Sequence, residues 1–170
     1  QHTHDFMLKH MKRQETEKQV RNMLDELRNK VPGVALRTTF ITGFPGETDA
    51  HFRHMADFLK EMEFDHVGIF VYSHEEGTAA YDYSDRVPKK AAEKRREELL
   101  LIQQKISQRK NAEKIGKILP VLVEGVDEGY LVTGRLTTQA PEIDGQVILD
   151  ACETEAGQIV PMLITGATDY

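Results

Sequence analysis

The residues best suited to binding chemistry stand at positions 43 to 48, Gly43-Phe44-Pro45-Gly46-Glu47-Thr48, between an apolar run and an acidic segment that can start a helix. Ligands of parallel α/β proteins bind at the carboxyl ends of strands. A glycine there lets a flat ligand lie against the backbone, and the free N–H groups of a helix start can meet an anionic group. A tight strand-to-helix turn without a ligand explains the same residues, so the motif alone leaves both interpretations open.

Two histidine pairs, His2-x-His4 and His51-x-x-His54, also have residue types that bind metal ions. No third or fourth ligand follows at a suitable spacing, so we expect solvated histidines and no metal site. The single cysteine, Cys152, excludes a disulfide within the chain and cannot by itself hold an iron–sulfur cluster, which needs several thiolates. We expect Cys152 to be a small, buried or half-buried side chain.

An alternation of helices and strands must position these residues. Apolar residues recur at three- and four-residue steps in three segments, and two further segments are β-branched and apolar. Thr48 is a suitable N-cap, Asp49 suits the positive end of the helix dipole, and Pro88 suits a first helical position. The second strand is apolar enough to be covered on both faces. The predicted elements are helix 15–30, strand 34–42, helix 48–62, strand 66–72 and helix 88–111.

This order predicts a parallel α/β fold for residues 1–111. Two strands are too few for an independent parallel sheet, and the chain opens without a methionine, so we expect it to be a piece of a longer polypeptide. Residues 112–170 change character: short apolar runs are separated by turns that contain glycine. They predict a small all-β module, a sandwich or a barrel.

Charge is divided unevenly between these two parts. Residues 112–170 hold three basic and ten acidic residues, a net charge of −7, whereas residues 1–111 carry +1. Nucleic-acid affinity depends on neutralising phosphates, so the acidic module is poorly suited to RNA and well suited to a basic protein. The sequence has no run of about 18 apolar residues and no visible signal peptide, and we expect a cytoplasmic protein.

Several stretches together resemble the radical S-adenosylmethionine (SAM) methylthiotransferases, and the resemblance covers essentially all 170 residues. RTTFITGFPGET is similar to the fifth-strand region of radical SAM enzymes, QHTHDFMLKHMKR to the segment after the fourth strand, and YSHEEGTAA to the stretch after the sixth. The β module looks like a TRAM domain. APEIDG and ITGATDY resemble the RimO branch, which modifies ribosomal protein, whereas the tRNA-modifying MiaB-like branch more often has Arg-Pro-Gly-Thr at residues 75–78.

The resemblance implies the carboxyl-terminal part of a partial TIM-like radical SAM barrel, followed by a small TRAM barrel. It implies SAM and two [4Fe–4S] clusters, whose cysteines are absent from this chain, so the chain alone should be inactive. Gly43, Pro45, Glu47 and Thr48 would form the cofactor-facing turn. Thr38 and Thr39 alternate faces, so one of them would point into the barrel. Arg13 would reach a cofactor carboxylate through its planar fork, or else be a surface arginine.

The implied reaction adds a methylthio group to the β-carbon of an aspartate in small-subunit ribosomal protein S-twelve, after a 5′-deoxyadenosyl radical has removed a hydrogen atom. Glu142 and Asp144 would either dock this protein or only shape a turn. Glu75 and Glu76 would line the substrate entrance or face solvent. Two alternatives stay open: a tRNA methylthiotransferase whose TRAM domain binds RNA, and a binding module without catalysis.

Overall fold

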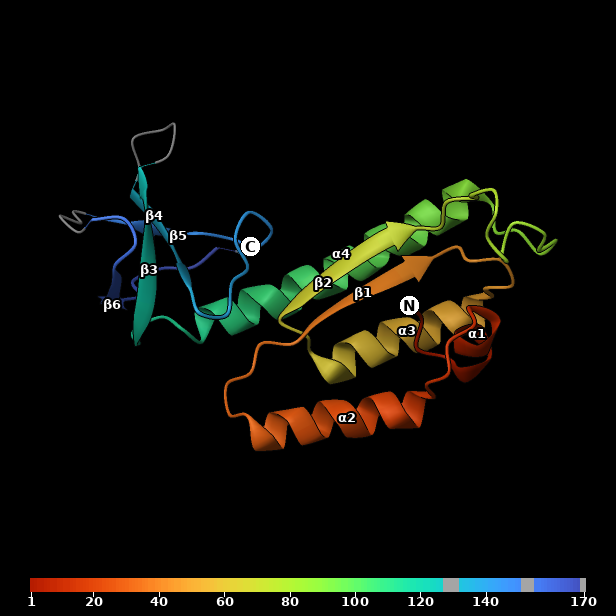
Figure 1. Cartoon of the computed structure of the whole chain (residues 1–170), viewed down its shortest axis with the longest axis horizontal. Coiled ribbons are helices and arrows are strands. Elements are labelled where there is room, and N and C mark those ends of the chain that lie inside the picture. The colour runs from red at the N-terminus through yellow and green to blue at the C-terminus, as the bar shows by residue number, and fades with distance from the viewer. Residues whose placement is uncertain (127–131, 151–154, 169–170) are drawn as a thin grey trace. The chain divides into compact units, whose positions relative to one another are not determined.

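The computed structural model describes residues 1–126, 132–150 and 155–168, which divide into two units, residues 1–106 (unit 1) and residues 107–170 (unit 2). Unit 1 combines helices with a two-stranded parallel sheet, and unit 2 contains a four-stranded antiparallel sheet (Figure 1). The elements of unit 1 are α1 (Asp5–His10), α2 (Glu17–Lys30), β1 (Arg37–Thr42), α3 (Asp49–Met62), β2 (His66–Val71) and α4 (Lys89–Ala112), the last of which continues into unit 2.

The starts of the two shorter predicted helices are fixed by their capping residues. The Thr48 hydroxyl accepts from the His51 N–H, and the His51 ring accepts from the Thr48 N–H, so α3 begins with a capping box. Thr16 and Gln19 form the same arrangement at α2. The predicted N-cap role of Thr48 is therefore confirmed, and Asp49 lies in the first turn, as expected.

Helices α3 and α4 cover one face of the sheet, and α2 packs alongside α3 (Figure 1). The core between them includes Phe40 of β1, Leu59 of α3 and Leu99 of α4, none of which is exposed. Burying each such side chain contributes roughly 1.5–3 kcal/mol to folding. Side chains alternate along the strands, so Thr38, Phe40 and Thr42 share this helix-covered face with Ile69.

The opposite face of the sheet, which we call the open face, consists of Arg37, Thr39, Ile41, His66, Gly68 and Phe70. No helix of unit 1 covers it among the described residues, and Phe70 is 59% exposed. The prediction that the second strand is covered on both faces is therefore wrong for this chain. The helices all pack on the side of Phe40 and Ile69, so the apolar residues of the other side meet solvent.

Helix α1 was not predicted. It has only six residues, too few to show an apolar period, and it begins where the His4 ring accepts from the Phe6 N–H. The first predicted strand is shorter than expected. Residues 34–36 stay outside β1, and the Leu36 N–H donates to the Asp65 carboxylate instead of to a strand.

Unit 2 has the strand order β5-β4-β3-β6, with every described pair antiparallel. Its strands are β3 (Ile118–Val126), β4 (Val132–Leu136), β5 (Val147–Leu149) and β6 (Ile159–Leu163). Its core is separate from that of unit 1 and is built around Val121, Val123, Leu136 and Leu149. The predicted all-β module is confirmed. Cys152, with its predicted burial, lies outside the described residues.

None of the described helices combines the length and the apolar composition that crossing a membrane would require.

Candidate functional site

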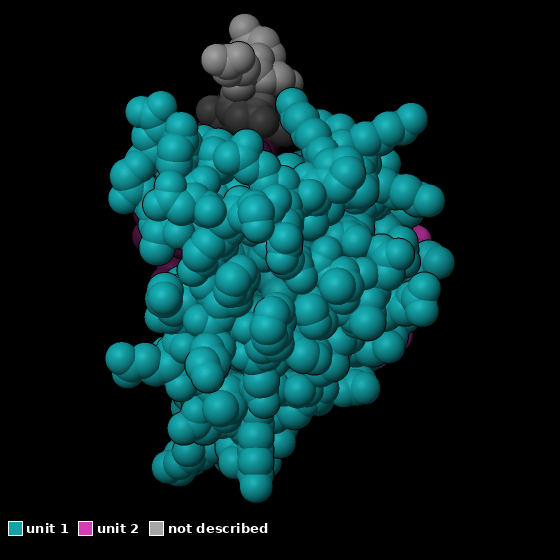
Figure 2. All heavy atoms as spheres, turned by 90° about the vertical axis from the view of Figure 1, so that its right-hand side faces the viewer, with its two compact units in different colours: residues 1–106 teal, residues 107–170 magenta. Residues whose placement is uncertain are grey.

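Three segments meet at the carboxyl ends of the strands of unit 1. The Gln1 amino group donates to the Thr39 carbonyl at 2.9 Å, and the Ile41 N–H donates to the Gln1 carbonyl at 3.1 Å. Gln1 therefore lies along the edge of β1 that β2 does not occupy. On the other side, the Tyr72 N–H donates to the Thr42 carbonyl at 2.9 Å. The Gly43–Thr48 turn thus lies between the amino-terminal segment and the segment that follows β2. Figure 2 shows the surface of unit 1 at this end.

The backbone of the turn explains its glycines. Gly43 and Gly46 have φ values of 76° and 82°, in the left-handed region that favours glycine. Gly43 is also buried against α4: an added Cβ would lie 2.3 Å from the Ala92 Cβ. Packing of the helix onto the strand therefore requires a glycine at position 43, independently of any ligand. Pro45 is buried in the same turn, and Thr48 is exposed at its end.

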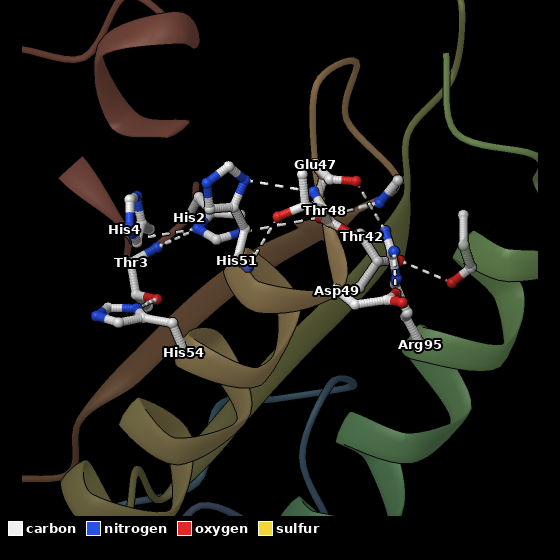
Figure 3. A network of polar contacts seen from close by, with 12 residues as sticks. His2, Thr3, His4, Thr42, Glu47, Thr48, Asp49, His51, His54 and Arg95 are labelled. Atoms are coloured by element: carbon white, nitrogen blue, oxygen red, sulfur yellow. Dashed lines mark hydrogen bonds and ion pairs between the residues drawn. The ribbon is translucent and has the colours of Figure 1, made fainter. Parts of the chain in front are cut away.

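Glu47 is the charged centre of the site and is only 4% exposed (Figure 3). One carboxylate oxygen accepts from the Gly43 N–H at 3.1 Å, and the other accepts from Arg95 of α4 at 2.6 Å. Arg95 also donates to Asp49 at 2.7 Å. Burial raises the pKa of Glu47, whereas the Gly43 N–H and the Arg95 guanidinium act in the opposite direction. The exposed carboxyl of Asp49 has a lowered pKa because Arg95 donates to it.

His2 lies next to Glu47 and is 1% exposed. Its Nδ1 accepts from the N–H groups of Thr3 and His4 at 2.8 and 3.1 Å, so the neutral ring carries its proton on Nε2. Nε2 has no hydrogen-bond partner and lies 3.7 Å from a Glu47 oxygen. Burial, reinforced by neighbouring histidines, lowers the pKa of His2 to about 3.

The four histidines that the sequence presents as two distant pairs form one cluster (Figure 3). The ring centroids of His4 and His51 are 4.5 Å apart, and those of His4 and His54 are 5.1 Å apart. His54 also joins Thr3 to Glu17, with both contacts at 3.0 Å. The prediction of solvated histidines is therefore wrong for His2, which is buried. It holds in part for His4, His51 and His54, which are half-exposed and whose rings pack on each other because the amino-terminal segment lies against α3. Among the described residues, no three His, Cys, Asp or Glu side chains are arranged to hold a metal ion.

Of the two threonines on β1, Thr39 lies on the open face and is exposed, whereas Thr38 lies on the helix-covered face. Arg13 is exposed. Burial and, to a smaller extent, the positive charge of Arg13 lower the pKa of the Gln1 amino group to about 6. Gly68 completes this area. A Cβ there would come within 3.3 Å of the Thr39 hydroxyl, so glycine keeps the open face flat beside Thr39.

The acidic residues predicted to dock the substrate are distant in sequence from the Gly43–Thr48 turn. Their environments differ from one another. Glu75 and Glu76 are exposed in the loop after β2, where Glu75 accepts from Ser73 at 2.5 Å. In unit 2, the Asp144 carboxylate accepts from the Ala140 N–H at 2.7 Å, which is the contact expected of a turn residue. Glu142 is exposed, with a φ of 62°.

Ala92 and Arg95 are site residues that the sequence interpretation missed, and His2 was considered there only as a metal ligand and expected to be solvated. Arg95 is 48 residues from Glu47 along the chain, and Ala92 carries no chemical signal of its own. A buried carboxylate needs a partner, but the sequence does not show that Glu47 is buried, and nothing in it singles out Arg95 among the basic residues of α4.

Comparisons with known proteins agree with this architecture. Residues 115–170 match the TRAM domain family. Over its whole length the chain is 44% identical to the ribosomal protein uS12 methylthiotransferase RimO of Syntrophotalea carbinolica, 43% to that of Trichormus variabilis and 45% to that of Thermosynechococcus vestitus. It spans 38%, 39% and 38% of the lengths of these relatives, in their carboxyl-terminal part. Residues 115–170 thus belong to the TRAM domain family, and the chain as a whole corresponds to the carboxyl-terminal part of RimO-type methylthiotransferases.

Proposed function

We propose that this chain is part of an enzyme that adds a methylthio group to the β-carbon of an aspartate in ribosomal protein uS12, in the cytoplasm. The observation that carries this proposal is the 41–45% identity, along the entire chain, to relatives that bear the name of this activity. The chain alone would be inactive, because a radical SAM reaction needs cluster ligands that its sequence lacks.

In this proposal unit 1 forms the last part of a partial TIM-like barrel, and its open face looks into the barrel. In such folds the helices lie outside the strands, and only one face of the sheet of unit 1 carries helices among the described residues. A SAM molecule would lie over the open face near the turn. Thr39 and Arg13 would hold its polar groups, and Gly68 would leave room for a flat ring.

Of the two threonines on β1, Thr39 would be the one that points into the barrel, because Thr38 lies on the helix-covered face. Glu47 would act on the cofactor indirectly. Its carboxylate is occupied by Arg95 and Gly43, so it would fix the shape of the turn rather than contact a ligand. Gly43, Pro45 and Thr48 would shape the same turn.

Bound SAM would supply the radical that removes a hydrogen atom from the substrate. The [4Fe–4S] clusters do not fit the described residues, which offer no group of metal ligands. Any cluster would therefore have to be held by residues outside this chain, and the residues present here would only bind and orient the cofactor.

Unit 2 would dock the substrate. Its sequence from residue 112 onward carries a net charge of −7, which repels phosphate and attracts the basic surface of a ribosomal protein. Exposed carboxylates such as Glu142 would contribute to this attraction, and Glu75 and Glu76 of unit 1 would do the same at the substrate entrance.

The test is a binding comparison with the 170-residue chain. Purified uS12, a tRNA anticodon stem-loop and an unrelated basic protein of similar charge would be titrated at low and high salt. We expect uS12 to bind, with an affinity that falls as salt screens the charges, and the other two to bind at least tenfold more weakly. Preference for the stem-loop would refute a protein substrate and favour tRNA methylthiotransfer. Equal binding of both basic proteins would refute specific docking.

A further inference from the structure

Unit 2 contains a groove of about 580 Å³ between β5 and the carboxyl-terminal end of β6. The floor of the groove belongs to the core of the unit, since Leu136, Leu149 and Met162 line it. Gln146–Asp150 form one wall, and residues 162–168 form the other. The groove therefore has an apolar floor, with β5 along one side and the end of β6 and the segment after it along the other.

Both strands beside the groove are at the ends of the sheet. The strand order is β5-β4-β3-β6, and no described strand pairs with the outer edge of β5 or of β6. An unpaired strand edge presents backbone N–H and C=O groups that an extended segment of another protein can satisfy. The apolar floor would receive alternate side chains of that segment, because successive side chains of a strand point to opposite faces.

The net charge of −7 from residue 112 onward favours a basic protein segment as the occupant. Asp150 is exposed at one wall, and Lys114, whose amino group donates to Asn111 at 2.9 Å, is the one cationic side chain among the described lining residues. The Gln139 amide oxygen is occupied by the Leu136 N–H. None of the described residues that line the groove is aromatic. Single-stranded nucleic acid binds through several cations and stacking aromatics, whereas the described lining of this groove offers one cation and no aromatic ring.

We propose that this groove binds an extended, basic segment of a protein, which adds as a strand to the outer edge of β5, where no described strand pairs. Apolar side chains of the segment enter the groove over Leu149 and Met162, and a Lys or Arg side chain faces Asp150 at the wall. The inference rests on the proposed function, in that the segment would belong to the uS12 substrate.

Two substitutions test the groove without removing core residues. Gly166 lies in the wall, its φ is outside the left-handed region, and an added Cβ would have no atom within 4 Å. Gly166→Phe should therefore fold and fill the groove, and Gly166→Ala is its control. Asp150→Lys reverses the charge at the wall, and Glu155→Lys makes the same change at an exposed position that does not line the groove.

Binding of purified uS12 to each variant of the 170-residue chain would be measured by titration calorimetry. We expect Gly166→Phe and Asp150→Lys each to weaken binding about tenfold, and the two controls to change it less than about twofold. In the unsubstituted chain, NMR shifts on adding uS12 should concentrate on residues 146–150 and 162–168. Retention of near-native NMR spectra in the variants would show that a loss of binding is not a loss of folding.

Other outcomes would overturn the proposal, and they separate it from the function on which it rests. If uS12 binds and the two groove variants bind as well as their controls, the groove is wrong and docking occurs elsewhere on the chain. If uS12 does not bind the unsubstituted chain, the docking role itself fails. Shifts of the groove residues caused by the stem-loop RNA, or by raising the protein concentration alone, would assign the groove to nucleic acid or to a second copy.

Discussion

Two independent constraints act on Gly43. Its φ of 76° lies in the left-handed region, and α4 leaves no room for a side chain. We expect Gly43→Ala to lower the free energy of unfolding of unit 1 by about 4 kcal/mol, since backbone strain and overpacking add. Gly77 has a φ of 79° but open space around it, so Gly77→Ala should lose only about 1 kcal/mol. Hydrogen exchange of the β1 amides would measure both, and equal losses would contradict the steric argument.

His2 should make the stability of unit 1 depend on pH. Its pKa falls from the ordinary 6.5 to about 3 on folding, so the unfolded chain binds the proton more readily than the folded chain. Stability should be complete above about pH 6.5 and should decrease as the pH falls towards 3. The lowered pKa of His51, which burial causes first of all, acts in the same direction.

The variant His2→Asn tests this dependence, because the amide oxygen can accept the N–H groups of Thr3 and His4 without titrating. Urea unfolding between pH 7 and pH 5 should show a weaker loss of stability in the variant than in the unsubstituted chain. His74→Asn, in an exposed loop, should leave the slope unchanged. An unchanged slope in His2→Asn would show that His2 is not the titrating group.

The sequence predicted which residues belong to the turn better than it predicted which side chains contact them. Thr48, followed by a segment with a helical apolar period, predicted a capped helix. The structure confirms it, because α3 begins with a capping box at Thr48. His2 was misassigned because solvation was inferred from local spacing, whereas contacts between residues 2–4 and 51–54 decide its burial. These are tertiary contacts between segments distant in sequence, and a local sequence pattern does not predict them.

At the scale of elements, Arg95 connects α4 to the turn and to the start of α3. Its partner Glu47 is fully buried at the side chain, so removing the guanidinium would leave a buried carboxylate unpaired. We expect Arg95→Met to lower the free energy of unfolding by about 3 kcal/mol. The exposed Arg53→Met should change it by less than about 0.5 kcal/mol.

Chemical denaturation would compare these variants with the double variant Arg95→Met, Glu47→Gln. The double variant should recover part of the loss, because no buried charge remains without a partner. If the double variant is as unstable as Arg95→Met alone, the ion pair is not the reason for the effect.

The two faces of β1 should differ in their importance for the cofactor. In the longer enzyme to which we assign this chain, Thr39→Val should weaken SAM binding several-fold by removing a hydroxyl on the open face, whereas Thr38→Val should not. Both substitutions keep a β-branched residue in the strand, so each is a control for the other. Equilibrium dialysis with SAM measures the effect without relying on turnover. A larger loss for Thr38→Val would show that the faces are assigned the wrong way round.

Helices and strands were largely predictable, because their apolar periods and caps are local. Helix 88–111 differs from α4 by one residue at each end, and strand 66–72 is one residue longer than β2. The exceptions have physical causes: α1 is too short to show a period, and residues 34–36 stay outside β1, where the Leu36 N–H donates to the Asp65 side chain rather than to a strand. The exposure of Phe70 could not be predicted, since strand composition does not say which faces the chain itself covers.

At the scale of the whole molecule, each unit has a core drawn only from its own residues. We expect Leu99→Ala to destabilise unit 1 by about 3 kcal/mol and Val121→Ala to destabilise unit 2 by about 2 kcal/mol. Hydrogen exchange with mass spectrometry should show faster exchange in residues 37–42 for the first variant and in residues 118–126 for the second. Faster exchange of both segments in either variant would show that the chain unfolds as one cooperative body.

The contact between Gly43 and Ala92 also limits how this sequence can evolve. The Thr42 hydroxyl donates to the Ala92 carbonyl at 3.0 Å, so strand and helix are held at a separation that leaves space for one methyl group and no more. A larger residue at position 92 would be tolerated only if the helix moved away and that hydrogen bond were lost. Position 92 should therefore accept only alanine or glycine, and a library that randomises this position alone should return almost exclusively these two residues.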